Sequence, residues 1–145
     1  MTIDLNAVSA IDVHVHVQID DSGRTASPPA LTAAMAAYFG SSEPPRTVDA
    51  TAHYYRERKM AAVVFTVDAT TNLGHAPNSI DDLAAGAHRN ADVLIPFGSV
   101  DPLQGEAAVE EARRQVGELG VRGFKFHPSV QGFDPSADEF DPLWS

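Results

Sequence analysis

The sequence contains no cysteine among its 145 residues. This absence excludes disulfide bonds and thiolate metal ligands, so any metal ion must be held by histidine or carboxylate side chains. It also favours a cytoplasmic location. Basic residues are scarce, with 10 Lys and Arg against 20 Asp and Glu and a net charge of −10. A charge of this sign promotes solubility and disfavours nucleic acid and anionic membranes as partners.

Long apolar runs are missing as well. No run approaches the roughly 20 residues of a membrane-spanning helix, and Met1–Leu5 has neither the basic nor the apolar stretch of a secretory signal. Hydrophobic residues make up 43% of the chain and charged residues 21%, which is the balance of an ordinary globular domain.

Short, mostly apolar segments alternate with helical patterns along the chain. Such segments are typical of strands that helices cover. Alternation at a spacing of about 30 residues predicts an α/β fold with a parallel sheet and right-handed crossovers. The predicted strands are Ile11–His16, Ala62–Val67, Val93–Val100 and Val121–His127.

Capping residues and apolar spacing define the predicted helices. Thr47 caps a helix that runs to about Met60, and Ser79 with Asp82 resembles a capping box. A third helix extends from about residue 105 to 119, with Glu110 and Arg114 as an i,i+4 pair on its outer side. Its apolar face is predicted to consist of Val109, Ala112, Val116 and Leu119.

The segment 17–46 is too long for an ordinary loop of about 2–6 residues after a strand. It carries two Pro-Pro pairs with a predicted short helix, Leu31–Phe39, between them. We interpret it as an inserted loop or lid over a site after the first strand. A packing or dimerisation element explains the segment equally well.

The end of the chain, Asp141–Ser145, has the sequence of a helix that has just begun. A parallel sheet without its last helix has an unpaired edge and an uncovered face. We therefore interpret residues 1–145 as the N-terminal half of one larger domain. We expect this half to be stable as a homo-oligomer or together with the rest of that domain. A small βα-sheet binding module, complete as it stands, is a further interpretation.

His14 and His16 are the first candidate site residues. Alternate residues of a strand share a face, so Asp12, His14 and His16 are predicted to lie together. Two neutral imidazoles form a good half-site for Zn²⁺ or a similar metal, and Asp12 would orient one of them. Two surface histidines on an edge strand are the simpler interpretation.

Lys125 and His127 share one face of the fourth predicted strand. A lysine that points into a protein interior is costly unless it meets a carboxylate or a substrate anion. Both residues are therefore candidates for substrate binding. The alternative is a salt-bridged lysine and a hydrogen-bonded histidine.

Asp68, His75 and Asp101 follow the second and third predicted strands. Asp68 and His75 are further candidates for substrate binding, although a loop histidine such as His75 is more often simply solvated. Asp101, followed by proline, has the sequence of a turn that caps the next helix.

Two motifs together resemble the amidohydrolase superfamily, in particular its amidohydrolase-2 branch. They are Ile11-Asp-Val-His-Val-His16 and Gly120-Val-Arg-Gly-Phe-Lys-Phe-His-Pro128, which Gln131-Gly-Phe-Asp-Pro135 follows. The resemblance implies a (β/α)₈ TIM barrel, of which this chain holds about the first four βα units. It also implies one divalent metal, expected to be zinc, held in part by His14 and His16.

The same resemblance implies the reaction classes. The stretch Tyr54-Tyr-Arg-Glu-Arg58 with Ala61–Asp68 looks most like 4-hydroxyphenyl-β-ketoacyl-CoA hydrolases. That implies C–C bond hydrolysis of a small carbonyl, carboxylate or acyl-CoA substrate. The alternatives are a non-oxidative decarboxylase of an aromatic or muconate-type acid and a catalytically inert half-barrel.

The family pattern carries over only in part. Its histidine and aspartate ligands after strands five and eight, and its histidine acid/base, would lie beyond Ser145. Lys125 falls near the position where some superfamily members carry a metal-bridging carboxylated lysine. The branch usually binds one metal without this group, which favours a structural or substrate-facing lysine.

Overall fold

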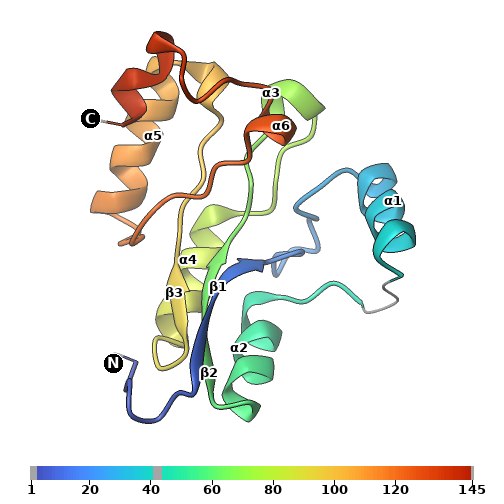
Figure 1. The fold of residues 1–145 in the computed structure, drawn as a ribbon, viewed down its shortest axis with the longest axis vertical. Helices are drawn as coiled ribbons and strands as arrows, with labels where there is room; N and C mark the ends of the chain where they lie inside the picture. The colour runs from blue at the N-terminus through green and yellow to red at the C-terminus, as the bar shows by residue number, and fades with distance from the viewer. Residues whose placement is uncertain (1–2, 41–43, 145) are drawn as a thin grey trace.

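A parallel three-stranded sheet forms the centre of the fold (Figure 1). The structure is a computed structural model that describes residues 3–40 and 44–144. The strand order is β1-β2-β3, so consecutive strands are neighbours and every connection passes through a helix. The predicted parallel α/β fold is confirmed, whereas closure into a barrel goes beyond the three strands seen here. The strands are β1 (Ala10–His16), β2 (Met60–Phe65) and β3 (Leu94–Pro96).

The fourth predicted strand is present only as a short extended segment. Its Phe124 forms a single parallel bridge with Gly98. The Arg122 N–H donates to the Pro96 carbonyl at 2.9 Å and the Lys125 N–H donates to Gly98 at 2.8 Å. Pro96 has no N–H to donate in return, which limits a regular ladder at this edge. The segment still runs parallel to the chain that follows β3, in the predicted order.

Helices α2 (Val48–Glu57) and α4 (Ile80–Arg89) pack together on one face of the sheet. Both predicted caps are confirmed, because Thr47 Oγ1 accepts from the Ala50 N–H and Ser79 Oγ accepts from the Asp82 N–H. The reciprocal half of the capping box comes from elsewhere, since the Ser79 N–H donates to Asp20 in the segment after β1. The shared core includes Val17, Ala52, Tyr55, Val64, Leu83 and Leu94.

Helix α5 (Glu106–Gly117) forms where predicted, but its inner face was predicted only in part, since Val109 and Ala112 are half-buried. Val116 is 54% exposed, while Ala108 and Gln115 are the buried positions. The Gln115 amide reaches under the helix and donates to the Ser99 carbonyl at 3.0 Å, which turns this face inward. The predicted Glu110 pair is also wrong, because Arg114 binds Glu111 instead and makes two hydrogen bonds to Asp81 of α4.

The segment between β1 and α2 carries α1 (Pro29–Phe39), which stands apart from the rest of the molecule in Figure 1. The predicted helix is therefore present, although none of its residues is buried. Tyr38 and Phe39 are 84% and 70% exposed. Of the segment 17–46, residues 41–43 lie outside the described residues. A lid role for the segment stays a prediction.

The remaining short elements cluster near the C-terminal ends of the strands (Figure 1). The predicted C-terminal helix opening forms part of a 3-10 helix, and its last residue, Ser145, lies outside the described residues. Within the described part of the chain, no helix is long and apolar enough to cross a membrane. These elements are α3 (Thr70–Leu73), η1 (Pro102–Gln104), α6 (Pro128–Gln131) and η2 (Asp138–Leu143).

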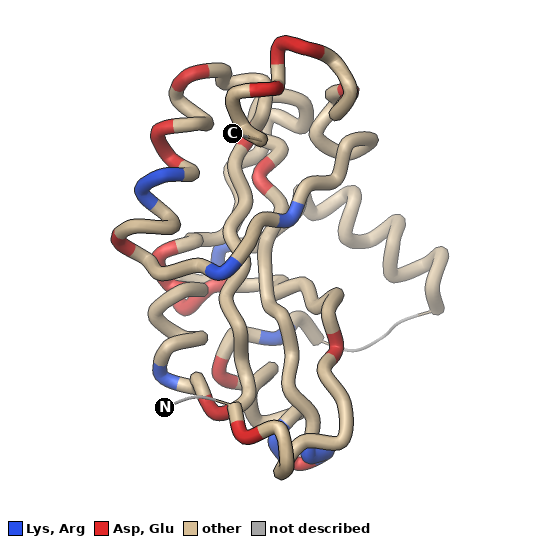
Figure 2. Tube along the Cα trace, turned by 60° about the vertical axis from the view of Figure 1, so that its left-hand side comes forward, with Lys and Arg blue, Asp and Glu red and all other residues tan. Residues whose placement is uncertain are grey.

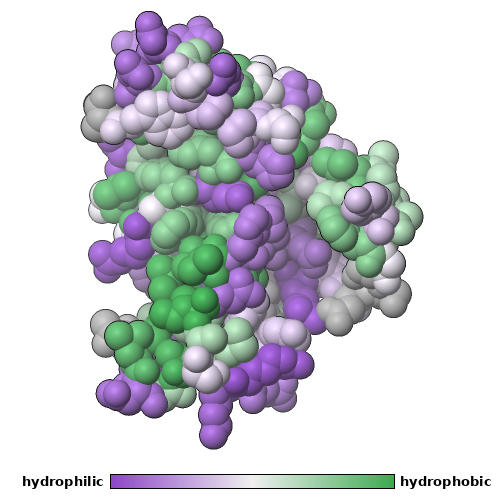
Figure 3. Space-filling view, in the orientation of Figure 1, coloured by the Kyte–Doolittle hydropathy of each residue, from purple (hydrophilic) through white to green (hydrophobic). Residues whose placement is uncertain are grey.

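Charge and hydropathy are distributed differently over the surface. Asp and Glu are spread over several elements and do not gather in one patch (Figure 2). Apolar side chains gather on one visible face over the lower part of the sheet and over α1 (Figure 3). Ile11 and Val13 of β1 are 39% and 70% exposed, which leaves the face of β1 opposite the helices accessible.

Candidate metal centre

An irregularity in β1 decides which side chains meet at its C-terminal end. Asp12 is paired with Ala62 of β2, but Val15 is paired with Val64, so three residues of β1 span two of β2. This extra residue is a β-bulge, which bends a strand and redirects its side chains. Beyond the bulge, Val15 packs against the core and His16 lies beside Phe65 on the other face.

The bulge overturns one prediction. Asp12 does not share a face with the two histidines and does not orient an imidazole. Its Oδ2 accepts from the Tyr55 hydroxyl of α2 at 2.6 Å, and its Oδ1 accepts from the His14 N–H at 3.0 Å. The Tyr55 hydrogen bond and the His14 N–H together lower the pKa of Asp12. Asp12 thus stabilises the bulge and the packing of α2 against β1, and it does not orient the imidazoles by a bond to either ring.

His14 and His16 do lie side by side. Their Nε2 atoms are 3.2 Å apart. Both rings contact Phe65, with centroid distances of 5.4 Å for His14 and 4.8 Å for His16. Phe65 is 2% exposed, so it forms a rigid apolar support for the two imidazoles.

The spacing of this pair fits two ligands of one metal ion. Nitrogen ligands about 2.0–2.1 Å from a tetrahedral zinc ion lie about 3.3–3.4 Å from each other. The observed 3.2 Å is close to that value. Without a metal, the same separation allows one imidazole to donate a hydrogen bond to the other.

The protonation of His16 also suits a metal ligand, because ligation needs a neutral imidazole. Although the residue is exposed as a whole, desolvation of its ring lowers the pKa of His16 to about 4. Electrostatic interactions with His14, Lys125 and His127 lower the pKa of His16 further. His16 is therefore neutral at pH 7.

Lys125 lies on the same side of the sheet as the histidine pair. Its Nζ is 5.4 Å from the centroid of the Phe65 ring that supports both imidazoles. Phe126 points elsewhere and packs against Phe133 and Trp144. No carboxylate among the described residues lies within ion-pair distance of Lys125, so the predicted alternative of a salt-bridged lysine has no support in that part of the chain.

His127 directly precedes α6 and lies near enough to influence His16 electrostatically. Its Nδ1 is 3.2 Å from the Ser129 hydroxyl. Its N–H donates to the Gln131 side chain at 2.7 Å. Its imidazole is only half-buried, which keeps it within reach of a ligand at this end of the sheet.

The other predicted residues are largely engaged by the main chain. Asp68 Oδ1 accepts from the Thr70 N–H and hydroxyl. Asp101 is buried and caps η1 through the Leu103 N–H, as its sequence predicted, and it also accepts from the Thr71 N–H. His75 Nε2 lies 3.1 Å from the Thr25 carbonyl and so contacts the segment after β1. Substrate contacts of Asp68 and His75 stay predictions.

The part that Gln131 plays in the site was not predicted from the sequence. Its side chain is fully buried and joins the ends of neighbouring strands. The amide donates to the carbonyls of Asp68 at 2.7 Å and Val100 at 2.8 Å, and its oxygen accepts from the His127 N–H at 2.7 Å. A glutamine that follows a His-Pro pair at the end of a strand is only a weak indication of this role, because the groups that the glutamine binds are brought to it by the fold.

The comparisons with known proteins agree with this arrangement. A family model described as Amidohydrolase matches residues 11–145. The chain belongs to the amidohydrolase family. Membership supports an activity of the metal-dependent hydrolase or decarboxylase type. No curated protein matches the chain.

This amidohydrolase chain brings two candidate metal ligands together, His14 and His16. Among its described residues, no group of three or more His, Cys, Asp or Glu side chains is placed to hold one metal ion. A zinc enzyme generally provides three protein ligands and an open position. The histidine pair would supply two of these three, and its metal binding stays a prediction.

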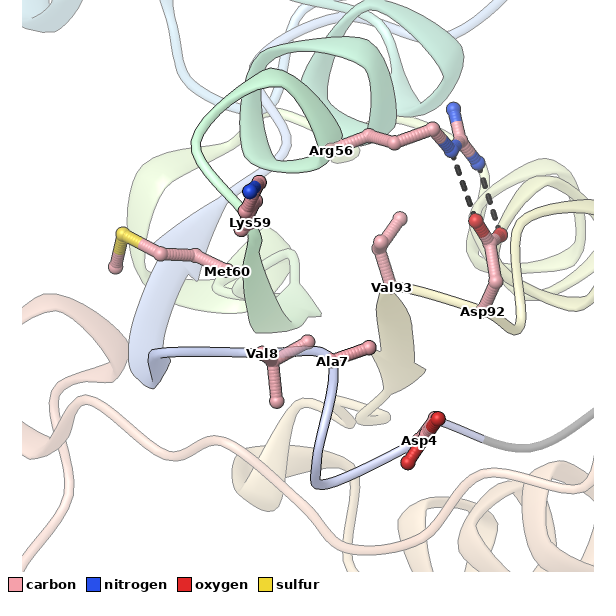
Figure 4. A pocket seen from close by; sticks show the side chains of 8 residues that line it. All are labelled: Asp4, Ala7, Val8, Arg56, Lys59, Met60, Asp92 and Val93. Carbon is pink, nitrogen blue, oxygen red and sulfur yellow. Dashed lines mark hydrogen bonds and ion pairs between the residues drawn. The ribbon is translucent and has the colours of Figure 1, made fainter.

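A cavity of about 240 Å³ lies beside the amidohydrolase histidines, and its lining includes both of them, Arg46, Thr51 and Tyr55. A larger cavity of about 370 Å³ lies at the opposite end, where β2 and β3 begin (Figure 4). Its rim cation Arg56 is held by Asp92 through two hydrogen bonds of 2.8 Å. Since parallel α/β sheets bind their ligands at the C-terminal ends of the strands, the smaller cavity is the candidate site.

Proposed function

We propose that the chain forms the β1 side of the active site of a metal-dependent amidohydrolase that breaks a C–C bond in a small carbonyl or carboxylate substrate. The observation that carries the proposal is the pair of Nε2 atoms, 3.2 Å apart and supported by Phe65 at the C-terminal end of β1. Strand ends on this side of the sheet are where such folds gather catalytic residues.

The residues of the chain have separate roles in this proposal. His14 and His16 hold a divalent metal, for which we propose zinc, through their Nε2 atoms. Such a metal polarises a carbonyl group and makes bound water more acidic. Phe65 keeps water away from one side of both rings. Lys125 places a positive charge on the same side, where it attracts a substrate anion.

The proposal extends to the fold. The parallel order β1-β2-β3, continued by the segment at residues 121–127, supports the first part of a (β/α)₈ barrel. The missing metal ligand and the catalytic acid/base would then come from polypeptide outside the described residues. A decarboxylase would use the same histidine pair, and release of CO₂ would distinguish it from a hydrolase.

Zinc titration tests the proposal. Calorimetry of the purified chain should show saturable binding of one zinc ion per chain. His14→Ala and His16→Ala should each weaken binding at least about tenfold, since even the loss of a residue that only orients a ligand costs about 10–100-fold. His53→Ala is the matched control, because His53 is exposed on α2 and only pairs with Glu57.

Zinc binding that both site variants leave unchanged would overturn the proposal. Equal weakening in His53→Ala would do the same, because it would show that any histidine of the chain contributes. Circular dichroism of each variant checks that the helices remain intact.

A further inference from the structure

A short hydrogen bond joins helix α2 to the bulge of β1. The Tyr55 hydroxyl donates to Asp12 Oδ2 at 2.6 Å, within the range of about 2.5–2.7 Å that is usual for a hydroxyl donor and an ionised carboxylate. Burial and this bond raise the pKa of Tyr55, so its hydroxyl keeps its proton. The same bond, together with the His14 N–H, lowers the pKa of Asp12. The donor and the acceptor are therefore both in the required state at neutral pH.

The second oxygen of Asp12 extends this link into the main chain of the bulge. Oδ1 accepts from the His14 N–H at 3.0 Å. The bulge lies between Asp12 and Val15, so His14 is inside it. A bulge leaves its extra residue outside the ladder of hydrogen bonds between strands. The carboxylate of Asp12 thus supplies an acceptor for the main chain from which the His14 side chain projects.

The two histidines are held in place in different ways. His16 is paired with Phe65 of β2, beyond the bulge, where the regular ladder fixes its main chain. Within the described sheet, His14 has no paired residue in β2. The main chain of His14 is held instead by Asp12, which Tyr55 holds in turn. The distance between the two Nε2 atoms therefore depends on this link from α2.

We propose that Tyr55 is a positioning residue for the histidine pair. Through Asp12, it stabilises the bulge that sets the 3.2 Å separation of the two Nε2 atoms. The metal-binding part of this inference rests on the proposed function. Tyr55 lines the same cavity as the histidines, but its hydroxyl proton is committed to Asp12. It acts through the main chain of His14 and not on a metal or a substrate.

Tyr55→Phe tests the role of the hydroxyl, because it leaves the ring in the core. Zinc affinity of the folded chain should fall about tenfold, the lower end of the usual 10–100-fold loss for residues that support metal ligands. Tyr54→Phe is the matched control, since the Tyr54 ring contacts Tyr55 and Arg58 and phenylalanine keeps both contacts. Its zinc affinity should match that of the wild type. A role in stability alone would lower the urea midpoint of Tyr55→Phe without changing its zinc affinity, and this result would overturn the inference.

Two variants of Asp12 separate the geometry of the bulge from the charge of the carboxylate. In Asp12→Asn, the amide oxygen can still accept from the His14 N–H, and the amide nitrogen can donate to the Tyr55 oxygen. This variant should bind zinc with an affinity close to that of the wild type. Asp12→Ala loses both bonds and should bind zinc about tenfold more weakly or worse. Equal losses in the two variants would show that the charge matters and not the bulge, which would overturn the inference.

Nuclear magnetic resonance of the metal-free chain measures the positioning itself. The nuclear Overhauser effect between the Hε1 protons of His14 and His16 should be strong in the wild type, because these protons lie beside the adjacent Nε2 atoms. It should stay strong in Tyr54→Phe and Asp12→Asn and weaken in Tyr55→Phe and Asp12→Ala. An equally strong effect in all variants would overturn the inference even if zinc binds normally. The predicted pattern in a wild-type chain that binds no zinc would overturn the metal centre alone.

Discussion

Replacing Gln131 by leucine should strongly destabilise the fold. Leucine has nearly the same size, so the change leaves little cavity and acts mainly on hydrogen bonds. In the wild-type protein, two carbonyl oxygens and one N–H lie 2.7–2.8 Å from the polar atoms of the glutamine side chain. The substitution leaves all three without a hydrogen-bond partner. An unsatisfied buried main-chain group costs about 1–3 kcal/mol.

The structure narrows that range. Val100 is 1% exposed, so water cannot replace the lost donor there. Asp68 and His127 are half-buried, and water can partly solvate their freed groups. We therefore expect the free energy of unfolding to fall by about 3 kcal/mol in total. The Val100 carbonyl should contribute the largest part, and the Asp68 carbonyl and the His127 N–H the rest.

Urea unfolding followed by circular dichroism measures this loss. The unfolding midpoint of Gln131→Leu should fall while the slope stays constant. Gln104→Leu is the matched control, since Gln104 is exposed on η1 and its replacement should change stability by less than about 0.5 kcal/mol. A loss below about 1 kcal/mol in Gln131→Leu would show that this side chain does not hold the strand ends together.

Two further predictions concern stability. Burial opposes ionisation of Asp20, but hydrogen bonds from Ser22, Ser79 and Arg24 outweigh it and lower the pKa of Asp20 to about 2. A lowered carboxyl pKa stabilises the fold above about pH 4, and this stabilisation is lost as the pH falls through about 2. In urea unfolding, Asp20→Asn should therefore cost about 1–2 kcal/mol at pH 7 and almost nothing at pH 2. A difference between the variant and the wild type that does not change with pH would contradict this. Gly98→Ala should cost about 1–3 kcal/mol, because a Cβ there would lie 2.8 Å from the Phe124 ring and closer still to Gln115 Oε1. Thermal unfolding measures this loss. Gly117→Ala is the control, since the space around Gly117 is open and the change should not destabilise the fold.

The sequence predicted the elements that depend on local pattern. Strand and helix alternation, the Thr47 and Ser79 caps and the closeness of His14 to His16 all follow from neighbouring residues. The face of β1 on which Asp12 lies could not be predicted in this way. A bulge leaves the alternation of polar and apolar residues unchanged but shifts the strand pairing by one residue.

Long-range contacts explain the other differences. Gln131 and Arg46 bind groups that lie more than 25 residues away in the sequence, such as Asp68 and Gln18, and no local pattern marks those partners. The exposed Val116 has a similar cause, since Gln115 finds its partner Ser99 only after α5 has packed against the sheet.

X-ray absorption spectroscopy of the zinc-loaded chain shows directly whether His14 and His16 bind the metal, because it reports the atoms that surround the ion. We expect scattering from two imidazole rings at about 2.0–2.1 Å, lost in the His14→Ala/His16→Ala double variant and retained in His53→Ala. Imidazole scattering that persists in the double variant, or a metal surrounded by oxygen alone in the wild-type chain, would contradict it.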